Sequence, residues 1–200
     1  MIRALATYSP WPWLRSCSPR SRFLKDERGV SAVEFALILP LMLLIYLGGV
    51  EVTKAINVNR KVTLAARTLV DLVAQVTKVT ATDISNVLKA GVIVSGADID
   101  PNVLKLRVSS LDIDAAGVAK IKWSKARSPQ TPRPFDETVT VPAGLNIPNT
   151  SLVWSEVEYV YTPTIKNLTF FGYALGGAMT FKDKNYMRPR LSDKVQCDAC

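Results

Sequence analysis

Residues 28–50, which read RGVSAVEFALILPLMLLIYLGGV, decide the fold of this chain. From Val30 to Val50 the only charged residue is Glu34. A helix rises about 1.5 Å per residue, so this run spans roughly 31 Å and matches a bilayer hydrocarbon core of about 30 Å. We therefore predict a transmembrane helix over residues 30–50.

The sequence on either side of this run predicts its retention and its orientation. A secretory signal has an apolar core of about 7–15 residues followed by a small-residue cleavage site. The present run is longer and is followed by Glu51-Val-Thr-Lys54. Residues 1–29 carry six basic and two acidic side chains, and the positive-inside rule keeps such a leader in the cytoplasm. We expect the residues after about 52 to lie outside the cytoplasmic membrane.

Glu34 lies about one turn inside the apolar run. A carboxylate at the centre of a span costs roughly 2.5–3.5 kcal/mol on insertion scales, and less near the interface. The residues alone leave two interpretations open. Glu34 is either an acid favoured by the positive end of the helix dipole or an intramembrane acid that requires a cationic partner. Pro40 lies in the same run, where it removes one backbone hydrogen bond and tends to kink the helix.

The order of residues around Gly29 resembles the prepilin signal of type IV pilins and pseudopilins. More closely, residues 28–40 resemble the N-terminal motif of the TadE/TadG-like family of the tight-adherence (Flp) pilus system. In that family a membrane prepilin peptidase cleaves after the glycine, the fifth residue of the mature chain is acidic, and an aromatic residue follows. The resemblance implies a processing site between Gly29 and Val30 and a pilin-type motif at Glu34 and Phe35.

The resemblance also implies a role for the acid and for the protein. Cleavage would create an ammonium group on Val30, which Glu34 of a neighbouring subunit would face. Removing one partner of a dry ion pair is strongly destabilising, so such a pair would set the register between subunits. The implied function is a minor pseudopilin or assembly component that supports pilus biogenesis and surface adhesion. Its implied partners are the prepilin peptidase, other pilins or pseudopilins, pilus assembly proteins and membrane lipid.

The helical pattern continues past the membrane over residues 51–79. Apolar residues recur there at spacings of three and four, which is the seam of a helix that packs against another surface. The seam consists of Ala55, Val58, Val62, Ala65, Leu69, Leu72 and Val76. We predict one helix from about residue 31 to 79, with its seam covered by the domain's own sheet or by neighbouring helices.

Residues 80–182 are predicted to form a small periplasmic domain of the α+β class with an antiparallel sheet. Residues 80–91, with Thr82-Asp83 near their start, are expected to form a short capped helix that Gly91 stops. The predicted strands are 103–113, 118–126, 151–161 and 178–182. The first two form a hairpin around the turn at 114–117. We expect a surface loop or short helix over 165–173 and a polar tail over 183–200.

Composition excludes several kinds of site. The sequence contains no histidine, so Ser-His-Asp and Cys-His catalysis and His-ligated metal sites are excluded. Of the net charge of +8, residues 1–29 supply +4. The domain therefore lacks the strong basic excess typical of nucleic-acid-binding modules. We expect no metal, no cofactor and no nucleic-acid partner.

Three groups of residues invite an enzymatic or ligand-binding interpretation. Glu156 and Glu158 alternate on one strand, as paired carboxylates do in glycosidases, but we expect that face to be solvated. The acids at 98, 100, 112 and 114 lack EF-hand spacing and are predicted to be turn acids. Cys197 and Cys200 have CxxC spacing without a following helix, so we expect a disulfide between them or a cross-link to a partner.

These observations predict that the protein is not an enzyme. They also predict a location in the inner membrane, with the domain in the periplasm and incorporation into a pilus as an open question. One alternative is an unprocessed single-pass envelope scaffold or ligand-binding protein, which would keep residues 1–29 in the mature chain. The other is an anchored periplasmic enzyme that uses Glu156, Glu158 or the cysteines.

Overall fold

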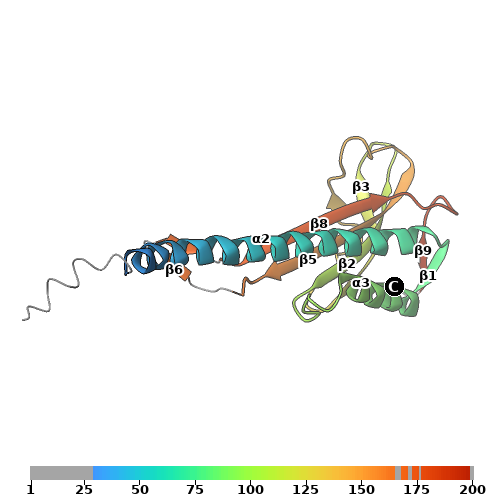
Figure 1. Ribbon diagram of the computed structural model, residues 1–200. Helices are drawn as coiled ribbons and strands as arrows, with labels where there is room; N and C mark the ends of the chain where they lie inside the picture. Colours follow the sequence, from blue (N-terminus) through green and yellow to red (C-terminus); the bar gives the residue numbers. More distant parts are fainter. Residues whose placement is uncertain (1–28, 165–167, 171–172, 176, 199–200) are drawn as a thin grey trace, which may run out of the picture. The chain divides into compact units, whose positions relative to one another are not determined.

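The computed structural model describes residues 29–164, 168–170, 173–175 and 177–198 (Figure 1). The predicted leader, apart from Gly29, lies outside this range. The chain divides between Gly48 and Gly49 into two compact units. This boundary coincides with the end of the predicted membrane span.

A single helix, α2 (Val30–Ala74), contains the apolar run and continues into the second unit. The predicted long helix is therefore confirmed, and Pro40 lies inside it. The predicted end at residue 79 is wrong. The helix stops at Ala74, and Lys78–Thr80 form the short strand β1 instead. Extended pairing with a distant part of the chain overrides the helical spacing at this point.

The predicted seam of α2 is correct in its first five positions and wrong in its last two. Leu72 and Val76 are each 37% exposed. The buried residues toward the end of the helix are Ala65, Ala66, Leu69, Val70, Val73 and Ala74. A straight helix has 3.6 residues per turn, so its covered face drifts away from a 3.5-residue seam. The covering surface is also wider than one seam, because the sheet and a second helix share it.

The second helix, α3 (Ala81–Ser95), begins within the predicted segment and ends later than predicted. Its N-cap is Thr80, which forms a capping box with Asp83. Gly91 does not stop the helix but lies inside it, and Gly96, with a φ of 81°, follows the last turn. A Cβ atom on Gly91 would lie 2.8 Å from Leu69 Cδ2. The glycine therefore permits close packing of α3 on α2.

The main sheet has five strands in the order β4-β3-β2-β5-β8, and every pairing in it is antiparallel. The strands are β2 (Lys105–Ile113), β3 (Ala119–Arg127), β4 (Thr138–Val139), β5 (Thr150–Tyr161) and β8 (Met179–Met187). The predicted α+β class and the β2–β3 hairpin are confirmed. A β-bulge interrupts the register of that hairpin between Ser110 and Leu111.

Two short two-stranded sheets replace segments that were predicted differently. β6 (Leu168–Phe170) pairs with β7 (Tyr173–Leu175) where we expected a loop or short helix. The prediction of a polar tail over residues 183–200 is also wrong. β8 extends to Met187, and β9 (Gln196–Asp198) pairs in parallel with β1. The pairing of β9 with β1 joins segments that are far apart in the sequence, which local composition does not reveal.

Both faces of the main sheet are covered. On one face, α2 and α3 enclose the larger core, which includes Leu69, Ile84 and Leu106 (Figure 1). On the other face, the connection between β3 and β5 covers a smaller cluster around Leu152 and Trp154. Alternate residues of β5 therefore supply the two cores. The rest of the second face carries the charged residues.

Candidate functional site

The predicted processing motif coincides with the start of α2. Gly29 precedes the first residue of the helix, Val30. Glu34 and Phe35 lie in its first two turns and are exposed, with 59% of Phe35 accessible. The structure thus places the two motif residues on one continuous helix.

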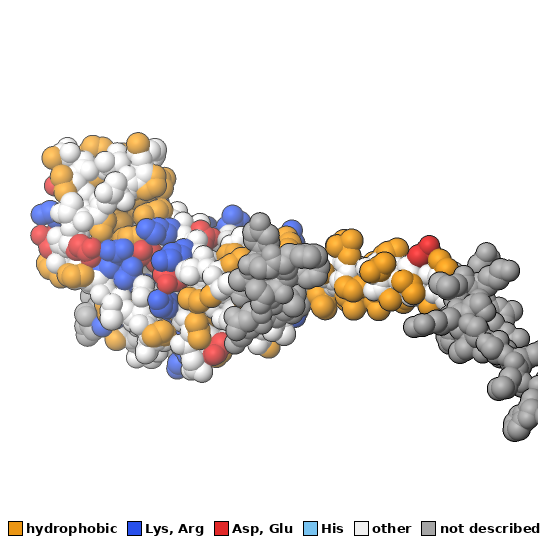
Figure 2. All heavy atoms as spheres, turned by 90° about the vertical axis from the view of Figure 1, so that its left-hand side faces the viewer, with side chains coloured by type: hydrophobic (Ala, Val, Ile, Leu, Met, Phe, Trp, Pro, Cys, Tyr) orange, Lys and Arg blue, Asp and Glu red, His pale blue; other side chains and the backbone are white. Residues whose placement is uncertain are grey.

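The apolar run forms the hydrophobic surface expected of a membrane span. α2 is the one helix among the described residues that is long and apolar enough to cross a bilayer. Large apolar side chains before Gly49 are exposed, and Leu37 and Ile45 reach 75% and 65%. Figure 2 shows hydrophobic side chains along this segment of the helix. Such a surface requires an apolar environment, which indicates a single-pass membrane protein.

Within the described part of the chain, Glu34 has no ion-pair partner. Its carboxylate lies on an apolar helix surface. A charge in such a place is favourable near the interface or when a partner supplies the opposite charge.

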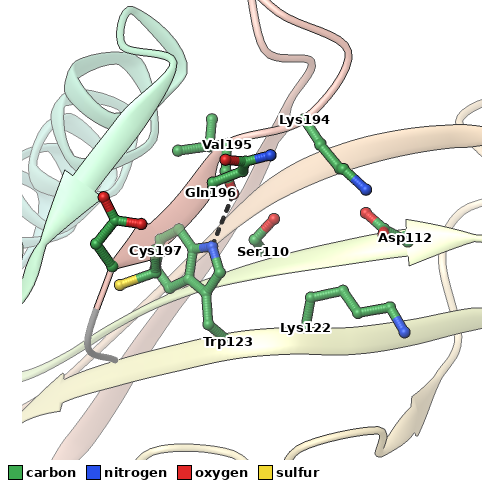
Figure 3. A pocket seen from close by; sticks show the side chains of 9 residues that line it. Ser110, Asp112, Lys122, Trp123, Lys194, Val195, Gln196 and Cys197 are labelled. Atoms are coloured by element: carbon green, nitrogen blue, oxygen red, sulfur yellow. Dashed lines mark hydrogen bonds between the residues drawn. The ribbon is translucent and has the colours of Figure 1, made fainter.

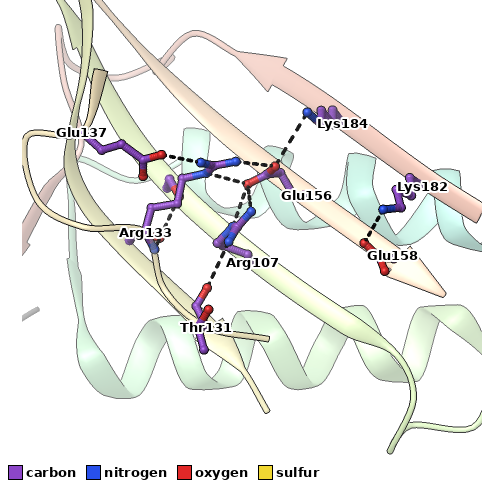
Figure 4. Close-up of polar contacts among 10 residues, drawn as sticks. Arg107, Thr131, Arg133, Glu137, Glu156, Glu158, Lys182 and Lys184 are labelled. Carbon is purple, nitrogen blue, oxygen red and sulfur yellow. Dashed lines mark hydrogen bonds and ion pairs between the residues drawn. The ribbon is translucent and has the colours of Figure 1, made fainter. Parts of the chain in front are cut away.

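A second cluster of charges lies on the face of the sheet opposite α2. Cross-strand pairing sets Glu156 between Arg107 of β2 and Lys184 of β8, and it sets Glu158 between Lys105 and Lys182 (Figure 4). Each row thus consists of a carboxylate flanked by two cations on neighbouring strands. Opposite charges directly across strands stabilise a sheet.

Glu156 is the centre of this network. Only 8% of the residue is exposed, so the expected solvated face is wrong at this position. Arg107 Nε lies 2.6 Å from Glu156 Oε2, and Arg133 contributes two further contacts of 3.0 Å. Lys184 Nζ lies 4.0 Å from Oε1. The loop that carries Arg133 also shields the carboxylate from water, which strand alternation alone could not predict.

Arg133 combines an ion pair with an aromatic contact. Its guanidinium carbon lies 4.4 Å from the centroid of the Trp154 ring, and that ring stacks on Tyr186 at 5.5 Å. The hydrogen bonds to Glu156 raise the pKa of Arg133 above its ordinary value. Arg133 also binds Glu137 at 2.8 Å. This residue therefore fastens the connection between β3 and β5 to the sheet.

Glu158 is held by two lysines, Lys105 at 2.9 Å and Lys182 at 3.0 Å. Their hydrogen bonds, Lys105 first, lower the pKa of the Glu158 carboxyl below its ordinary value. A general acid requires the opposite shift, toward a protonated carboxyl at neutral pH. The arrangement of Glu156 and Glu158 is therefore that of a structural charge network.

The partners of the two glutamates were not predicted from the sequence. The signal was present as three pairs of like charges with a spacing of two, on three strands: Lys105 and Arg107, Glu156 and Glu158, and Lys182 and Lys184. The sign of the charges alternates from β2 to β5 to β8, which is the order of these strands in the sheet. Arg133 had no comparable signal, because it comes from an irregular loop.

Cys197 lies in β9, at the edge of a pocket of about 470 Å³ that also contains Trp123, Val195 and Lys122 (Figure 3). Trp123 Nε1 donates a hydrogen bond of 2.9 Å to the Val195 carbonyl. Cys197 is disulfide-bonded. Cys200 lies outside the described residues, so its pairing with Cys197 stays a prediction.

Three of the four acids considered for calcium have partners within the protein. Asp98 pairs with Lys61, which lowers the pKa of the Asp98 carboxyl. Asp100 and Asp114 accept backbone hydrogen bonds within their own turns. In the described ranges no three acidic or cysteine side chains converge in a way that could hold a metal ion.

Comparison with known proteins supports the interpretation of the N-terminal segment. Residues 29–70 match the model of the family described as TadE-like protein. The match begins at the proposed processing site and covers about a fifth of the chain. No curated protein and no solved structure matches the chain. The resemblance drawn from the motif is thereby confirmed for this segment, which indicates a component related to the tight-adherence pilus.

Proposed function

We propose that this protein is a minor pseudopilin or assembly component of a tight-adherence pilus. In this proposal it is a substrate of the prepilin peptidase and not an enzyme. It is held in the inner membrane by residues 30–50, with its N-terminus in the cytoplasm and its domain in the periplasm. It supports pilus biogenesis and surface adhesion through contacts with other pilins and assembly proteins.

The observation that carries the proposal is the position of Glu34. This residue is four positions after Val30, about one helical turn, on a helix whose large apolar side chains before Gly49 are exposed among the described residues. Cleavage after Gly29 creates an ammonium group at the very start of that helix. Glu34 of one subunit and the new terminus of the next then neutralise each other in the membrane.

Mass spectrometry of the N-terminus tests processing. The protein is extracted from membranes of its native host, with and without Gly29→Leu. A mature chain that begins at Val30, and that is lost in the Gly29 variant, supports the proposal. Gly144→Leu is the matched control, because no atom lies within 4 Å of a Cβ built at Gly144. A mature chain that retains residues 1–29 would contradict processing and favour the unprocessed scaffold.

Replacement of Glu34 separates processing from assembly. Glu34→Gln is isosteric and leaves Gly29 and Val30 unchanged, so we expect the mature terminus to form as in the parent. We expect the variant to lose co-purification with other pilus subunits, since its amide cannot neutralise their terminal ammonium. Normal co-purification of the cleaved Gln variant would show that the ion pair is not needed.

A further inference from the structure

The main sheet ends in two edges of unequal length. β4 forms one edge with two residues, whereas β8 forms the other with nine. Among the described residues, β8 pairs only with β5, and none of its nine residues is buried. A long open edge presents a row of backbone N–H and C=O groups to which a strand of another chain can add. The β8 edge is therefore the place where this sheet can accept a further strand.

One backbone amide of β8 indicates which residues face the open edge. The Lys184 amide donates a hydrogen bond of 2.8 Å to Oδ1 of Asp183, the preceding residue. An amide that points toward β5 would donate to a carbonyl of that strand instead. The Lys184 N–H therefore points away from β5. Alternate residues of a strand direct their backbone groups to the same side, so the amide of Lys182 faces the open edge as well.

Lys182 and Lys184 also bring positive charge to this edge (Figure 4). Their side chains are 60% and 58% exposed, although each lies near a glutamate of β5. Each of the two cross-strand rows contains two cations and one carboxylate, so each row has one positive charge in excess. The cations on the inner strand β2, Lys105 and Arg107, are less exposed. The excess charge is thus accessible to a partner on β8.

A second copy of β8 does not fit this edge. The antiparallel pairing of two β8 strands with the greatest overlap is centred on Asp183, the middle residue of the strand. This pairing sets Lys182 of each copy opposite Lys184 of the other. Like charges directly across strands are destabilising. Carboxylates at the same positions of an added strand would instead continue the alternation of signs across the sheet.

We propose that the β8 edge binds an extended acidic segment of another protein as an added antiparallel strand. The segment has two carboxylates at alternate positions, which face Lys182 and Lys184 as Glu158 and Glu156 do from the opposite side. Backbone hydrogen bonds supply the affinity of such an added strand, and the ion pairs fix its register. The inference concerns the domain alone and is independent of processing at Gly29.

The two lysines also have a simpler explanation. Lysine on an edge strand is a common device against association between sheets. A protected edge rejects every strand, whereas a selective edge accepts one whose carboxylates match the lysines. The two explanations therefore differ in what they predict for a strand of alternating acids.

A labelled peptide tests the proposal with the full chain in micelles of a non-ionic detergent. The probe is acetylated Thr-Glu-Thr-Glu-Thr-Glu-Thr with fluorescein at its C-terminus, and fluorescence anisotropy measures binding. A peptide of the same composition with its three glutamates in succession is the control for charge. We expect the alternating peptide to bind at least about tenfold more tightly than this control. Absence of binding up to about 1 mM would contradict the proposal and assign the lysines to protection of the edge.

Methyl groups on the peptide nitrogens distinguish strand addition from attraction between charges. In an antiparallel pair, the residues opposite Lys182 and Lys184 exchange backbone hydrogen bonds with them, so N-methylation of the glutamates should abolish binding. N-methylation of the threonines changes only the far edge of the peptide and should leave the affinity within about twofold. Equal effects of the two methylations would overturn strand addition. The protein is unchanged in this comparison, so misfolding cannot explain the result.

Two double variants of the protein locate the binding edge. Lys182→Gln combined with Lys184→Gln should weaken binding of the alternating peptide at least about tenfold. Lys78→Gln combined with Lys89→Gln is the matched control, because it removes the same charge from exposed positions outside β8. An equal loss of affinity in both double variants would mean that the peptide follows net charge, which would overturn the assignment to β8.

Discussion

Arg133 meets Glu156 through two contacts, with Nε 3.0 Å from Oε2 and Nη2 3.0 Å from Oε1. The planar guanidinium thus engages both oxygens of a carboxylate in the middle of the sheet. Arg133 comes from a long irregular connection, whereas Glu156 belongs to β5. This pair is therefore one of the contacts that hold the connection on the second face of the sheet, beside the ion pairs of Asp136 with Lys120 and Lys122.

Removal of the Glu156 carboxylate should strongly destabilise the domain. In Glu156→Ala, Arg107 and Arg133 remain largely buried without their common partner. The expected loss is about 3–5 kcal/mol, typical of breaking one side of a buried ion pair. Urea unfolding of the full chain in detergent micelles measures it. Glu137→Ala is the control, since it removes a single ion-pair partner of Arg133, and an equal effect of both changes would contradict the central role of Glu156.

Arg133→Lys should loosen the connection between β3 and β5 while the fold persists. Lysine keeps the charge but cannot engage both carboxylate oxygens or stack on Trp154. Phe135 lies two residues further on, so faster chymotrypsin cleavage at this residue is the expected readout. Lys120→Arg serves as the control, because Lys120 pairs with Asp136 on the surface. Unchanged cleavage in Arg133→Lys would show that positive charge alone holds the loop.

The ion pairs of Glu158 should make part of the domain's free energy of unfolding sensitive to acid. Its folded pKa is lowered from an ordinary value of 4.5 by Lys105 and Lys182. A lowered carboxyl pKa contributes stability above the unfolded pKa and loses it as the pH falls through the folded pKa. The parent should therefore exceed Glu158→Gln in stability at pH 7, and the difference should shrink as the pH falls below about 4.5. A difference that is independent of pH would contradict this assignment.

Gly91 should not tolerate a side chain. A Cβ atom would lie 2.8 Å from Leu69 Cδ2 and 3.4 Å from Leu106 Cδ1, and both leucines are fully buried. Gly91→Val should lower the free energy of unfolding by about 1–3 kcal/mol through overpacking. Lys89 lies in the same helix and is exposed, so Lys89→Val measures the effect of the low helix propensity of valine without overpacking. Equal stability of the two variants would show that α3 can move away from α2 at little cost.

Trp123 should hold the last strand in place. Trp123→Phe removes the hydrogen bond to the Val195 carbonyl and leaves that buried group unpaired, at a cost of about 1–3 kcal/mol. Gln196, whose amide donates to Thr77, should then exchange its hydrogen faster, as measured by mass spectrometry of the C-terminal peptide. Tyr186→Phe controls for loss of an aromatic polar group elsewhere. If the exchange rate of the Gln196 amide does not change in Trp123→Phe, other contacts hold β9 in place.

The local patterns of the sequence predicted several elements correctly. The apolar run, the β2–β3 hairpin and β5 follow from periodicity and turn residues over short windows. The end of α2 and β9 could not be found in this way. They depend on the pairing of β1 with β9, which are distant in the chain, and partner choice overrides local preference in strands. The β6–β7 hairpin is a local pairing, and its three-residue strands are too short to give a periodic signal.

The candidate sites also divide into features that local patterns reveal and features that they do not. The motif at Gly29, Glu34 and Phe35 is a local pattern, so the sequence alone located it. The network around Glu156 joins three strands and a loop, and only the spacing of like charges on those strands hinted at it. The solvated face expected for Glu156 was wrong because nothing local indicates that Arg133 covers it.

The parallel pairing of β1 with β9 has a consequence for how the domain is made. β1 (Lys78–Thr80) comes soon after the long helix and leaves the ribosome well before its partner β9 (Gln196–Asp198). The end of α2 must therefore wait for β9 to be synthesised before this edge can close. A chain terminated before Gln196 keeps α2 but lacks the partner of β1.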